Sequence, residues 1–153
     1  MDLLFWRHAE ASPSTEGDTD MARSLTHRGE KQALRMGRWL DGRLPDGARI
    51  FCSPALRTVQ TAQALGRKFK TVDDLSPGSS PEDLLSLVKW PHGGGTVLVV
   101  GHQPVLGLTI AALMGWQGEE LAIRKGSVWW LRKKRTDSSN STQLLTVQAP
   151  EML

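Results

Sequence analysis

Residues 96–102 read TVLVVGH, and this stretch decides the fold that the sequence predicts. Its first five residues are apolar or β-branched without a break, which is typical of a strand buried on both faces of a sheet. The run ends at Gly101 and His102, and near-helical apolar spacing follows from about Pro104 to Met114. A buried strand that leads into a helix in this way is the repeating unit of parallel α/β sheets.

The same alternation extends along the chain in both directions. Strands are expected at residues 3–6, 49–52, 70–72, 96–100, 128–132 and 143–147, and helices at 26–42, 53–69, 81–89 and 104–114. We expect Thr26 and Ser53 to cap the first two helices, with Pro54 in the first turn of the second. The alternation through residue 115 predicts an α/β fold, a three-layer α/β/α sandwich with a mostly parallel sheet. The last two strands flank a polar turn at residues 136–140, which predicts a C-terminal antiparallel hairpin.

Composition narrows the class of protein. With 153 residues, of which 39% are hydrophobic and 23% charged, the chain has the size of a single soluble globular domain, residues 1–153. No apolar run is long enough to span a bilayer. Arg7 interrupts the N-terminal apolar run, unlike in a secretory signal. We therefore expect a cytoplasmic protein that has no membrane partner.

The cysteine count excludes internal disulfides and multi-cysteine metal sites, and the charge pattern gives no sign of a nucleic-acid partner. Cys52 is the only cysteine, so the chain has no internal disulfide and no multi-cysteine metal site. The formal net charge is only +3 and the charged residues are scattered along the chain. This charge pattern does not predict a nucleic-acid partner.

Polar side chains that share one chemistry follow three of the predicted strands. Arg7 and His8 end the first strand, Arg57 lies in the first turn of the second helix, and His102 ends the strand described above. Because ligands of open α/β sheets bind beyond the carboxyl ends of the strands, we expect these side chains to converge. Arginine forks and helix N-termini bind phosphoryl oxygens, and a neutral imidazole can attack phosphorus. The residues predict a phosphoryl-transfer site that needs no metal or cofactor, and they leave open which histidine is the nucleophile.

Four segments carry a resemblance to a known family. They are Arg7-His8-Ala9-Glu10, Leu25-Thr26 with Gly29, Ser53-Pro54-Ala55-Leu56-Arg57-Thr58-Val59-Gln60-Thr61-Ala62, and Val99-Val100-Gly101-His102-Gln103-Pro104. In order and spacing they resemble the motifs of the histidine phosphatase superfamily, which has the phosphoglycerate mutase-like fold. Ala9 stands where the RHG signature usually has glycine, which slightly restricts the backbone beside His8. The short chain and the RHAE opening look most like the small phosphohistidine phosphatases of the SixA type.

The resemblance implies a role for each of these polar side chains. His8 would take the phosphoryl group from the substrate, and a water molecule would then hydrolyse the phosphohistidine so formed. Arg7 and Arg57 would hold the phosphoryl oxygens, and His102 would complete the pocket. We expect Gln103, the next residue of that motif, to contact the phosphate as well.

The sequence also offers several candidates for a general acid. They are Glu10, Asp73, Asp74, Glu82 and Asp83. Of these, Asp74 occupies roughly the place from which larger members of the family supply their acid. An imidazole leaving group, whose conjugate acid has a pKa of about 6.5, needs little protonation, whereas an alkoxide needs much more. A site without an obvious acid therefore favours phosphohistidine as the substrate.

The predicted substrate is a protein. The segment between the second helix and Thr96 is too short for the helical cap that larger members insert there, so we expect an open site that admits a folded partner. The predicted function is hydrolysis of phosphohistidine on a phosphotransfer or phosphocarrier protein by a monomeric enzyme. A small-molecule phosphomonoesterase on the same scaffold and an inactive phosphate-binding module remain the alternatives.

Overall fold

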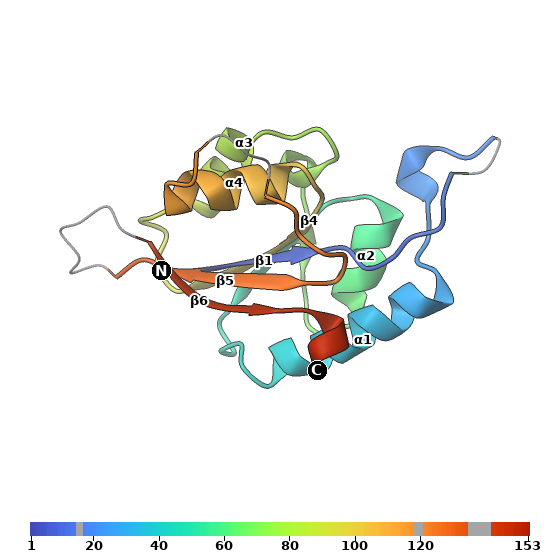
Figure 1. Cartoon of the computed structure of the whole chain (residues 1–153), viewed down its shortest axis with the longest axis horizontal. Helices are drawn as coiled ribbons and strands as arrows, with labels where there is room; N and C mark the ends of the chain where they lie inside the picture. Colours follow the sequence, from blue (N-terminus) through green and yellow to red (C-terminus); the bar gives the residue numbers. More distant parts are fainter. Residues whose placement is uncertain (15–16, 118–120, 135–141) are drawn as a thin grey trace.

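The computed structural model describes residues 1–14, 17–117, 121–134 and 142–153. The strands in this part of the chain are β1 (Asp2–Arg7), β2 (Arg49–Cys52), β3 (Lys70–Thr71), β4 (Thr96–Gly101), β5 (Val128–Arg132) and β6 (Gln143–Gln148). The α-helices are α1 (His27–Asp41), α2 (Leu56–Gln63), α3 (Pro81–Val88) and α4 (Val105–Met114), and the short 3₁₀ helices are η1 (Asp20–Ala22), η2 (Asp73–Leu75) and η3 (Pro150–Met152). Figure 1 shows their arrangement.

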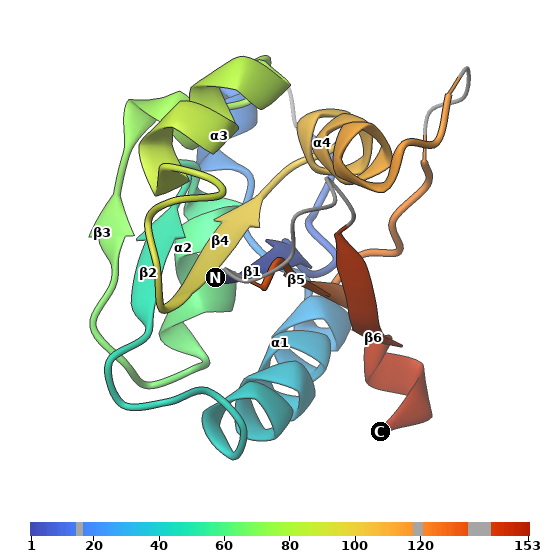
Figure 2. The same ribbon diagram turned by 90° about the vertical axis from the view of Figure 1, so that its left-hand side faces the viewer.

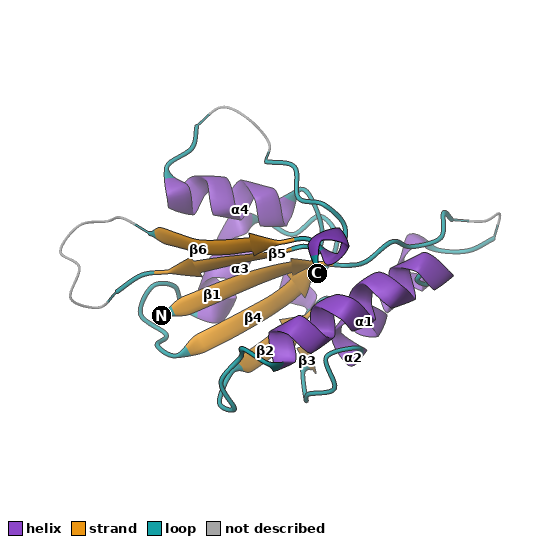
Figure 3. Ribbon diagram, turned by 60° about the horizontal axis from the view of Figure 1, so that its bottom comes forward, coloured by secondary structure: helices purple, strands orange, loops and turns teal. Residues whose placement is uncertain are grey.

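The six strands form one sheet with the order β3-β2-β4-β1-β5-β6. The first four strands of the chain are parallel to one another, whereas β5 is antiparallel to both of its neighbours, β1 and β6 (Figure 3). The predicted mostly parallel sheet with a C-terminal antiparallel pair is therefore confirmed. The polar turn expected at residues 136–140 lies outside the described residues.

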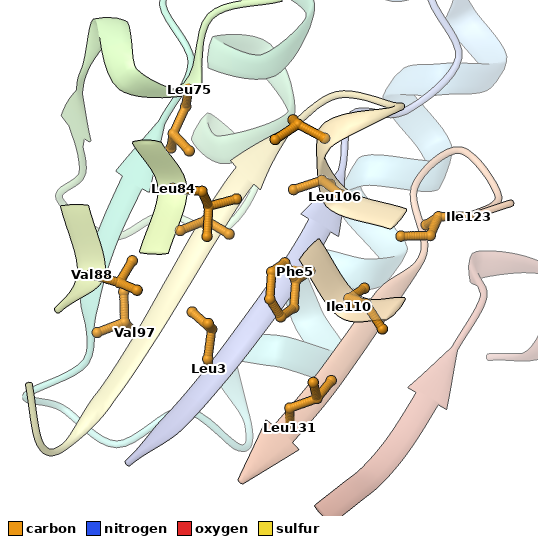
Figure 4. Packing of buried hydrophobic residues seen from close by; sticks show 12 residues of the cluster. Leu3, Phe5, Leu75, Leu84, Val88, Val97, Leu106, Ile110, Ile123 and Leu131 are labelled. Atoms are coloured by element: carbon orange, nitrogen blue, oxygen red, sulfur yellow. The ribbon is translucent and has the colours of Figure 1, made fainter. Parts of the chain in front are cut away.

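Helices cover both faces of the sheet, which gives the three predicted layers (Figure 2). Successive residues of a strand point to opposite faces. Leu3 and Phe5 of β1 accordingly pack in one buried cluster with residues of α3 and α4, while Leu4 and Trp6 pack in a second cluster with residues of α1 and α2. Figure 4 shows the first cluster, with Ile110 of α4 lying over the sheet near Phe5. β1 is thus buried on both faces, as its unbroken apolar run predicts.

The carboxyl ends of β1, β2 and β4 meet at one edge of the sheet. The pairing of β1 with β4 ends at Arg7 and Gly101. The ladder continues one residue further, because the backbone N–H of His8 donates to the Gly101 oxygen at 3.1 Å. On the other side of β4, the backbone N–H of Ser53 donates to the Val100 oxygen at 3.0 Å. The residues that follow these three strands are thereby held side by side.

The start of α2 differs from the prediction. The helix begins at Leu56 with Ala55 as its N-cap and has no side-chain cap. Ser53 is therefore not the cap residue, and Pro54 precedes the helix instead of lying in its first turn. The physical reason is that the Ser53 hydroxyl lies 2.7 Å from His102 Nε2 and accepts a hydrogen bond from the Ala55 N–H at 3.2 Å.

The end of α2 also differs, because the helix stops at Gln63 and not at the predicted Phe69. Gly66 adopts a φ of 77°, a left-handed conformation that turns the chain away from the helix axis. Phe69 then packs against the core from the segment that leads into β3. The apolar spacing that predicted a longer helix thus reflects burial of a loop residue.

The other predicted elements are present within a few residues of their expected bounds. Thr26 caps α1 as expected, since its hydroxyl accepts a hydrogen bond from the Gly29 N–H at 3.0 Å. Among the described residues, none of the helices is long and apolar enough to cross a membrane.

Candidate active site

His8 lies directly after β1 and is 6% exposed. Its Nδ1 lies 2.7 Å from the carbonyl oxygen of Ala9. Because a carbonyl oxygen only accepts hydrogen bonds, Nδ1 carries the ring proton and Nε2 keeps its lone pair. Burial lowers the pKa of His8 to about 4, and the positive charges of Arg57 and Arg7 contribute to the shift. His8 is therefore a neutral imidazole at neutral pH, with the lone pair on Nε2.

His102 lies directly after β4 and faces His8. The two ring centroids are 5.4 Å apart and the rings are tilted by 54°. Burial lowers the pKa of His102 to about 3, and Arg57 and His8 add to this shift. The Nε2 atom of His102 contacts the Ser53 hydroxyl, whereas its Nδ1 is buried and has no hydrogen-bond partner among the described residues.

Arg57, in the first turn of α2, is only 4% exposed. Its Nη1 donates to the backbone oxygen of Asp20 at 2.8 Å, and its Nη2 donates to the Asp20 carboxylate at 3.1 Å. Arg23 pairs with the other carboxylate oxygen of Asp20, also at 3.1 Å. These contacts hold the end of the Arg57 guanidinium and leave its buried Nε without a partner in the described part of the chain.

Arg7, the last residue of β1, is held in a similar way. Its Nη1 donates to the Ile123 carbonyl oxygen at 2.6 Å. Burial lowers the pKa of Arg7, and its Nε is buried without a hydrogen-bond partner within the described ranges. Both arginines are thus fixed through one part of the guanidinium group while another N–H donor remains unused.

The unused donors define the chemistry of the site. Buried side-chain nitrogen and oxygen atoms without a partner occur at four places in the described structure, and three of them are Arg7 Nε, Arg57 Nε and His102 Nδ1. Leaving a buried polar group unsatisfied costs about 1–3 kcal/mol. A phosphoryl group supplies several acceptor oxygens and a charge complementary to the two guanidinium groups. The arrangement can therefore bind a phosphoryl group next to Nε2 of a neutral histidine.

Gln103 and Asp74, two further predicted site residues, are placed differently: the amide of Gln103 already has hydrogen-bond partners, and Asp74 makes no hydrogen bond or ion pair with the two arginines and two histidines in the described structure. The side-chain amide of Gln103 donates to Leu121 O at 2.6 Å and accepts from Gly107 N at 2.8 Å, so a phosphate contact would have to use its second amide hydrogen. Asp74 is exposed on η2, which follows the edge strand β3. Roles for Gln103 and Asp74 stay predictions.

Two of the other candidate acids, Glu10 and Asp83, have hydrogen-bond partners near them in the sequence or in the fold. Glu10 accepts a hydrogen bond from the Thr26 hydroxyl at 2.9 Å and lies 3.7 Å from an Arg28 nitrogen. Asp83 forms the capping box of α3 with Ser80. Asp20, which was not among the candidate acids, contacts a predicted site residue directly through its ion pair with Arg57. It lies in the polar stretch from Ser12 to Arg23, which has no periodicity that would mark it.

Thr61 is a second contact that sequence reasoning missed. Its buried hydroxyl accepts from the Ala9 N–H at 3.1 Å and donates to the Arg57 carbonyl oxygen at 2.8 Å. Because the Ala9 carbonyl in turn holds His8 Nδ1, Thr61 links the segment after β1 to the first turn of α2. Its place in the motif beginning at Ser53 was the available signal.

Replacing Thr61 by valine is expected to lower the free energy of unfolding by about 1–3 kcal/mol, because the Ala9 N–H would be buried without an acceptor. Urea unfolding of the native chain and the variant measures this difference. Thr61→Ser keeps the hydroxyl and should recover most of the loss. Equal losses in the two variants would mean that packing of the methyl group, and not the hydrogen bond, is responsible.

The lowered pKa values of His8 and His102 predict a dependence of stability on pH. In the unfolded chain both residues take up protons near pH 6.5, whereas in the folded chain they stay neutral down to about pH 4 and about pH 3. Since the unfolded state binds more protons in this window, the free energy of unfolding falls as the pH is lowered, by up to about 1.4 kcal/mol per pH unit for each histidine.

Urea unfolding between pH 7 and pH 5 measures this slope. The matched variant His102→Gln removes one of the two buried imidazoles and should make the slope shallower. His92→Gln, at an exposed histidine, is the control and should retain the native slope. A native slope that is unchanged by His102→Gln would contradict the prediction.

Comparison with known proteins identifies the class to which this fold and this site belong. The model of the histidine phosphatase superfamily (branch 1) matches residues 3–77. The phosphohistidine phosphatase SixA homolog of Haemophilus influenzae is 31% identical over 131 residues, which cover 75% of this chain and 78% of the relative. Phosphohistidine phosphatase SixA of Escherichia coli is 28% identical over 121 residues, which cover 74% of each chain.

Solved structures show the same fold over nearly the whole chain. The protein histidine phosphatase SixA in complex with tungstate has a TM-score of 0.78 at 24% identity, with 99% of each chain covered. A phosphoserine phosphatase mutant from Entamoeba histolytica, in complex with phosphoserine, has a TM-score of 0.73 at 16% identity, with 99% of this chain and 98% of that chain covered.

The chain therefore belongs to the histidine phosphatase superfamily, a class of hydrolases. The expected phosphoglycerate mutase-like architecture is confirmed by the solved structures. Within the superfamily, the protein is a SixA-type histidine phosphatase, as its RHAE opening and short chain predict.

Proposed function

We propose that this enzyme removes phosphate from a phosphohistidine on another protein, through a phosphorylated His8. One observation carries the proposal: the neutral imidazole of His8, with its lone pair on Nε2, lies 5.4 Å from the ring of His102 and within the electrostatic reach of Arg57 and Arg7, and all three of these side chains have an unpartnered buried nitrogen in the described structure. Each component is what phosphoryl transfer requires, namely a nucleophile, fixed positive charge and donors for the phosphoryl oxygens.

The reaction consists of two displacements at phosphorus. In the first, Nε2 of His8 bonds to phosphorus while the P–N bond of the substrate breaks, and the substrate imidazole leaves with the electron pair and takes up a proton. In the second, a water oxygen bonds to phosphorus and loses a proton to solvent, the P–N bond breaks with its electron pair returning to Nε2 of His8, and inorganic phosphate is released. Arg7 and Arg57 hold the phosphoryl oxygens through their free N–H groups in both steps. No step uses a metal ion, which is typical of the superfamily.

The leaving group supports phosphohistidine as the substrate. An imidazole is expelled with little help from an acid, because its conjugate acid has a pKa of about 6.5. An alkoxide leaving group needs a positioned general acid, and Asp20, an acidic side chain that contacts Arg57, is occupied by ion pairs with Arg57 and Arg23. Asp73, Asp74 and Glu82 are exposed and remain candidates for an acid, of which Asp74 is the one the resemblance favours.

The short segment between α2 and β4 supports a protein as the substrate. The residues between α2 and β4 form β3, η2 and α3, and α3 buries Leu84 and Val88 in the core against the sheet. This segment is therefore used to cover one face of the sheet. An uncapped site admits a folded protein, and the curated relatives named above are phosphohistidine phosphatases.

A small-molecule phosphomonoesterase is the second candidate function, because a phosphoserine phosphatase has the same fold. The two functions are separated by steady-state rates on a phosphohistidine-bearing phosphocarrier protein, on phosphoserine and on sugar phosphates. We expect kcat/KM for the phosphohistidine protein to exceed that for phosphoserine and for sugar phosphates by at least about 10²-fold, because the ester substrates need a general acid. Faster release from the esters, together with a large fall in their turnover in Asp74→Asn, would overturn the proposal. An inactive phosphate-binding module would release phosphate from none of them.

The partner is accordingly a phosphotransfer or phosphocarrier protein with an exposed phosphohistidine. The monomeric state and the cytoplasmic location expected from the sequence stay predictions. We also propose that residues 1–153 act as a single domain.

A further inference from the structure

We propose that Ser53 is a positioning residue, which fixes the tautomer of His102 so that Nδ1 carries the proton and donates to the phosphoryl group. The inference rests on the proposed function only for the identity of the group that His102 contacts. The tautomer itself follows from a count of hydrogen-bond donors and acceptors around the Ser53 hydroxyl.

Two groups contact the Ser53 hydroxyl oxygen in the described structure. The backbone N–H of Ala55 donates to it at 3.2 Å, and Nε2 of His102 lies 2.7 Å from it. Ser53 is completely buried, so its own O–H must find an acceptor among these neighbours or remain unsatisfied. The Ala55 N–H is a donor, and His102 Nε2 is therefore the acceptor that is available to the hydroxyl.

The direction of this bond determines the protonation of the ring. If Ser53 donates to Nε2, the Nε2 atom must hold a lone pair, and the single proton of the neutral imidazole is on Nδ1. The ring is neutral because burial lowers the pKa of His102 to about 3. The opposite tautomer would place a donor on Nε2 and leave the hydroxyl proton of Ser53 without an acceptor.

The position of Nδ1 connects this tautomer to the site. Nδ1 of His102 is buried without a partner among the described residues, as are Nε of Arg7 and Nε of Arg57. With the proton on Nδ1, all three atoms are N–H donors available to phosphoryl oxygens; the ring of His102 lies 5.4 Å from that of His8, and the charges of Arg7 and Arg57 act on His8. With the proton on Nε2, the lone pair of Nδ1 would repel those oxygens. Ser53 thus acts on the reaction through His102.

The first experiment reads the tautomer directly in the native enzyme. ¹⁵N NMR of histidine-labelled protein at pH 7 should show His102 with Nδ1 in the protonated range and Nε2 in the unprotonated range. Addition of inorganic phosphate should shift the Nδ1 resonance. A proton on Nε2 of His102 in the native protein would overturn the proposal without the need for any variant.

The second experiment uses Ser53→Ala, with Thr58→Val as the matched control. Thr58 is also buried, and its hydroxyl donates to the carbonyl oxygens of Ser53 and Ala55, so Thr58→Val removes a buried hydroxyl from the same turn without touching His102. In Ser53→Ala we expect the His102 proton to move to Nε2 and kcat for a phosphohistidine protein to fall about 10-fold to 100-fold, less than the loss of a complete donor. Thr58→Val should retain the native tautomer.

The outcomes separate this inference from the proposed function. Ser53→Ala with the native tautomer would overturn the role of Ser53, and a changed tautomer with unchanged kcat would overturn the role of Nδ1 in the reaction. If Ser53→Ala does not fold, Ser53→Thr keeps the hydroxyl and should keep both the tautomer and most of kcat. If the native enzyme releases no phosphate from phosphohistidine proteins, the proposed function fails, while the NMR result still decides the tautomer.

Discussion

Replacing Arg57 by alanine is expected to lower kcat for a phosphohistidine protein by about 10³-fold, which corresponds to about 4 kcal/mol of transition-state stabilisation. The guanidinium of Arg57 is buried, and its Nε has no partner within the described residues. A charge and a donor fixed in this way need no reorganisation when negative charge develops on the transferring phosphoryl oxygens. Rapid-mixing kinetics with a labelled phosphoprotein measure the loss.

The structure provides a matched set of variants for this test. Arg57→Lys keeps the charge but loses the planar fork of donors, so it should recover only a small part of kcat. In the native chain Asp20 also pairs with Arg23, so its carboxylate has a second partner when Arg57 is replaced, and urea unfolding checks that both variants are folded. Arg35→Ala, at an exposed position of α1, is the control for loss of an arginine. A loss below about tenfold in Arg57→Ala would remove Arg57 from the site.

The location of His8 and His102 at the carboxyl ends of buried strands could be predicted from the sequence. The apolar runs that end at Arg7 and at Gly101 define buried parallel strands, and the carboxyl ends of such strands meet at one edge. The observed pairing of Arg7 with Gly101 brings His8 and His102 together at that edge. Residue type and the unbroken apolar runs were sufficient to predict that both histidines lie at the carboxyl ends of buried strands, whereas the adjacency of β1 and β4 comes from the structure.

The contacts that hold these side chains could not be predicted in the same way. Asp20 lies in a polar segment without periodicity, and its pairing with Arg57 depends on how that segment folds back on α2. The Ser53-Pro54 sequence is typical of a helix start, yet the Ser53 hydroxyl lies against an imidazole that only the sheet brings near. A serine hydroxyl can cap a helix or hydrogen-bond to another side chain, and tertiary packing determines which of the two it does.

The choice of nucleophile shows the same limit. The residue types alone offer two histidines at equivalent places, after β1 and after β4, and only the resemblance of Arg7-His8-Ala9-Glu10 to the family's first motif favours His8. The structure distinguishes them by what each ring nitrogen contacts. His8 has Nδ1 on a carbonyl oxygen, which leaves the lone pair on Nε2, whereas His102 has Nε2 on a hydroxyl and a buried Nδ1 without a partner in the described structure. His8 therefore suits attack on phosphorus, and His102 suits donation to its oxygens.

Replacing His8 by alanine is expected to abolish the phosphoenzyme and to lower turnover by about 10⁴-fold or more, because no other described side chain at the site offers a comparable lone pair. A labelled phosphohistidine protein is mixed with the native enzyme and with His8→Ala, and the reaction is quenched within milliseconds. The native chain should carry transient label that survives base and is lost in acid, the behaviour of a phosphorus–nitrogen bond. The label should be attached at Nε2, since Nδ1 donates to the Ala9 carbonyl.

Two controls separate the loss of the nucleophile from the loss of the site. His92→Ala, at an exposed histidine, should retain the native rate and the native label. His8→Ala should still bind inorganic phosphate within a few-fold of the native affinity, because Arg7, Arg57 and His102 keep their unpartnered donors. Turnover that persists in His8→Ala would overturn the covalent mechanism, and label on Nδ1 would overturn the tautomer on which it is based. Lost turnover with retained phosphate binding requires His8 to supply the attacking lone pair, while the arginines and His102 supply the binding.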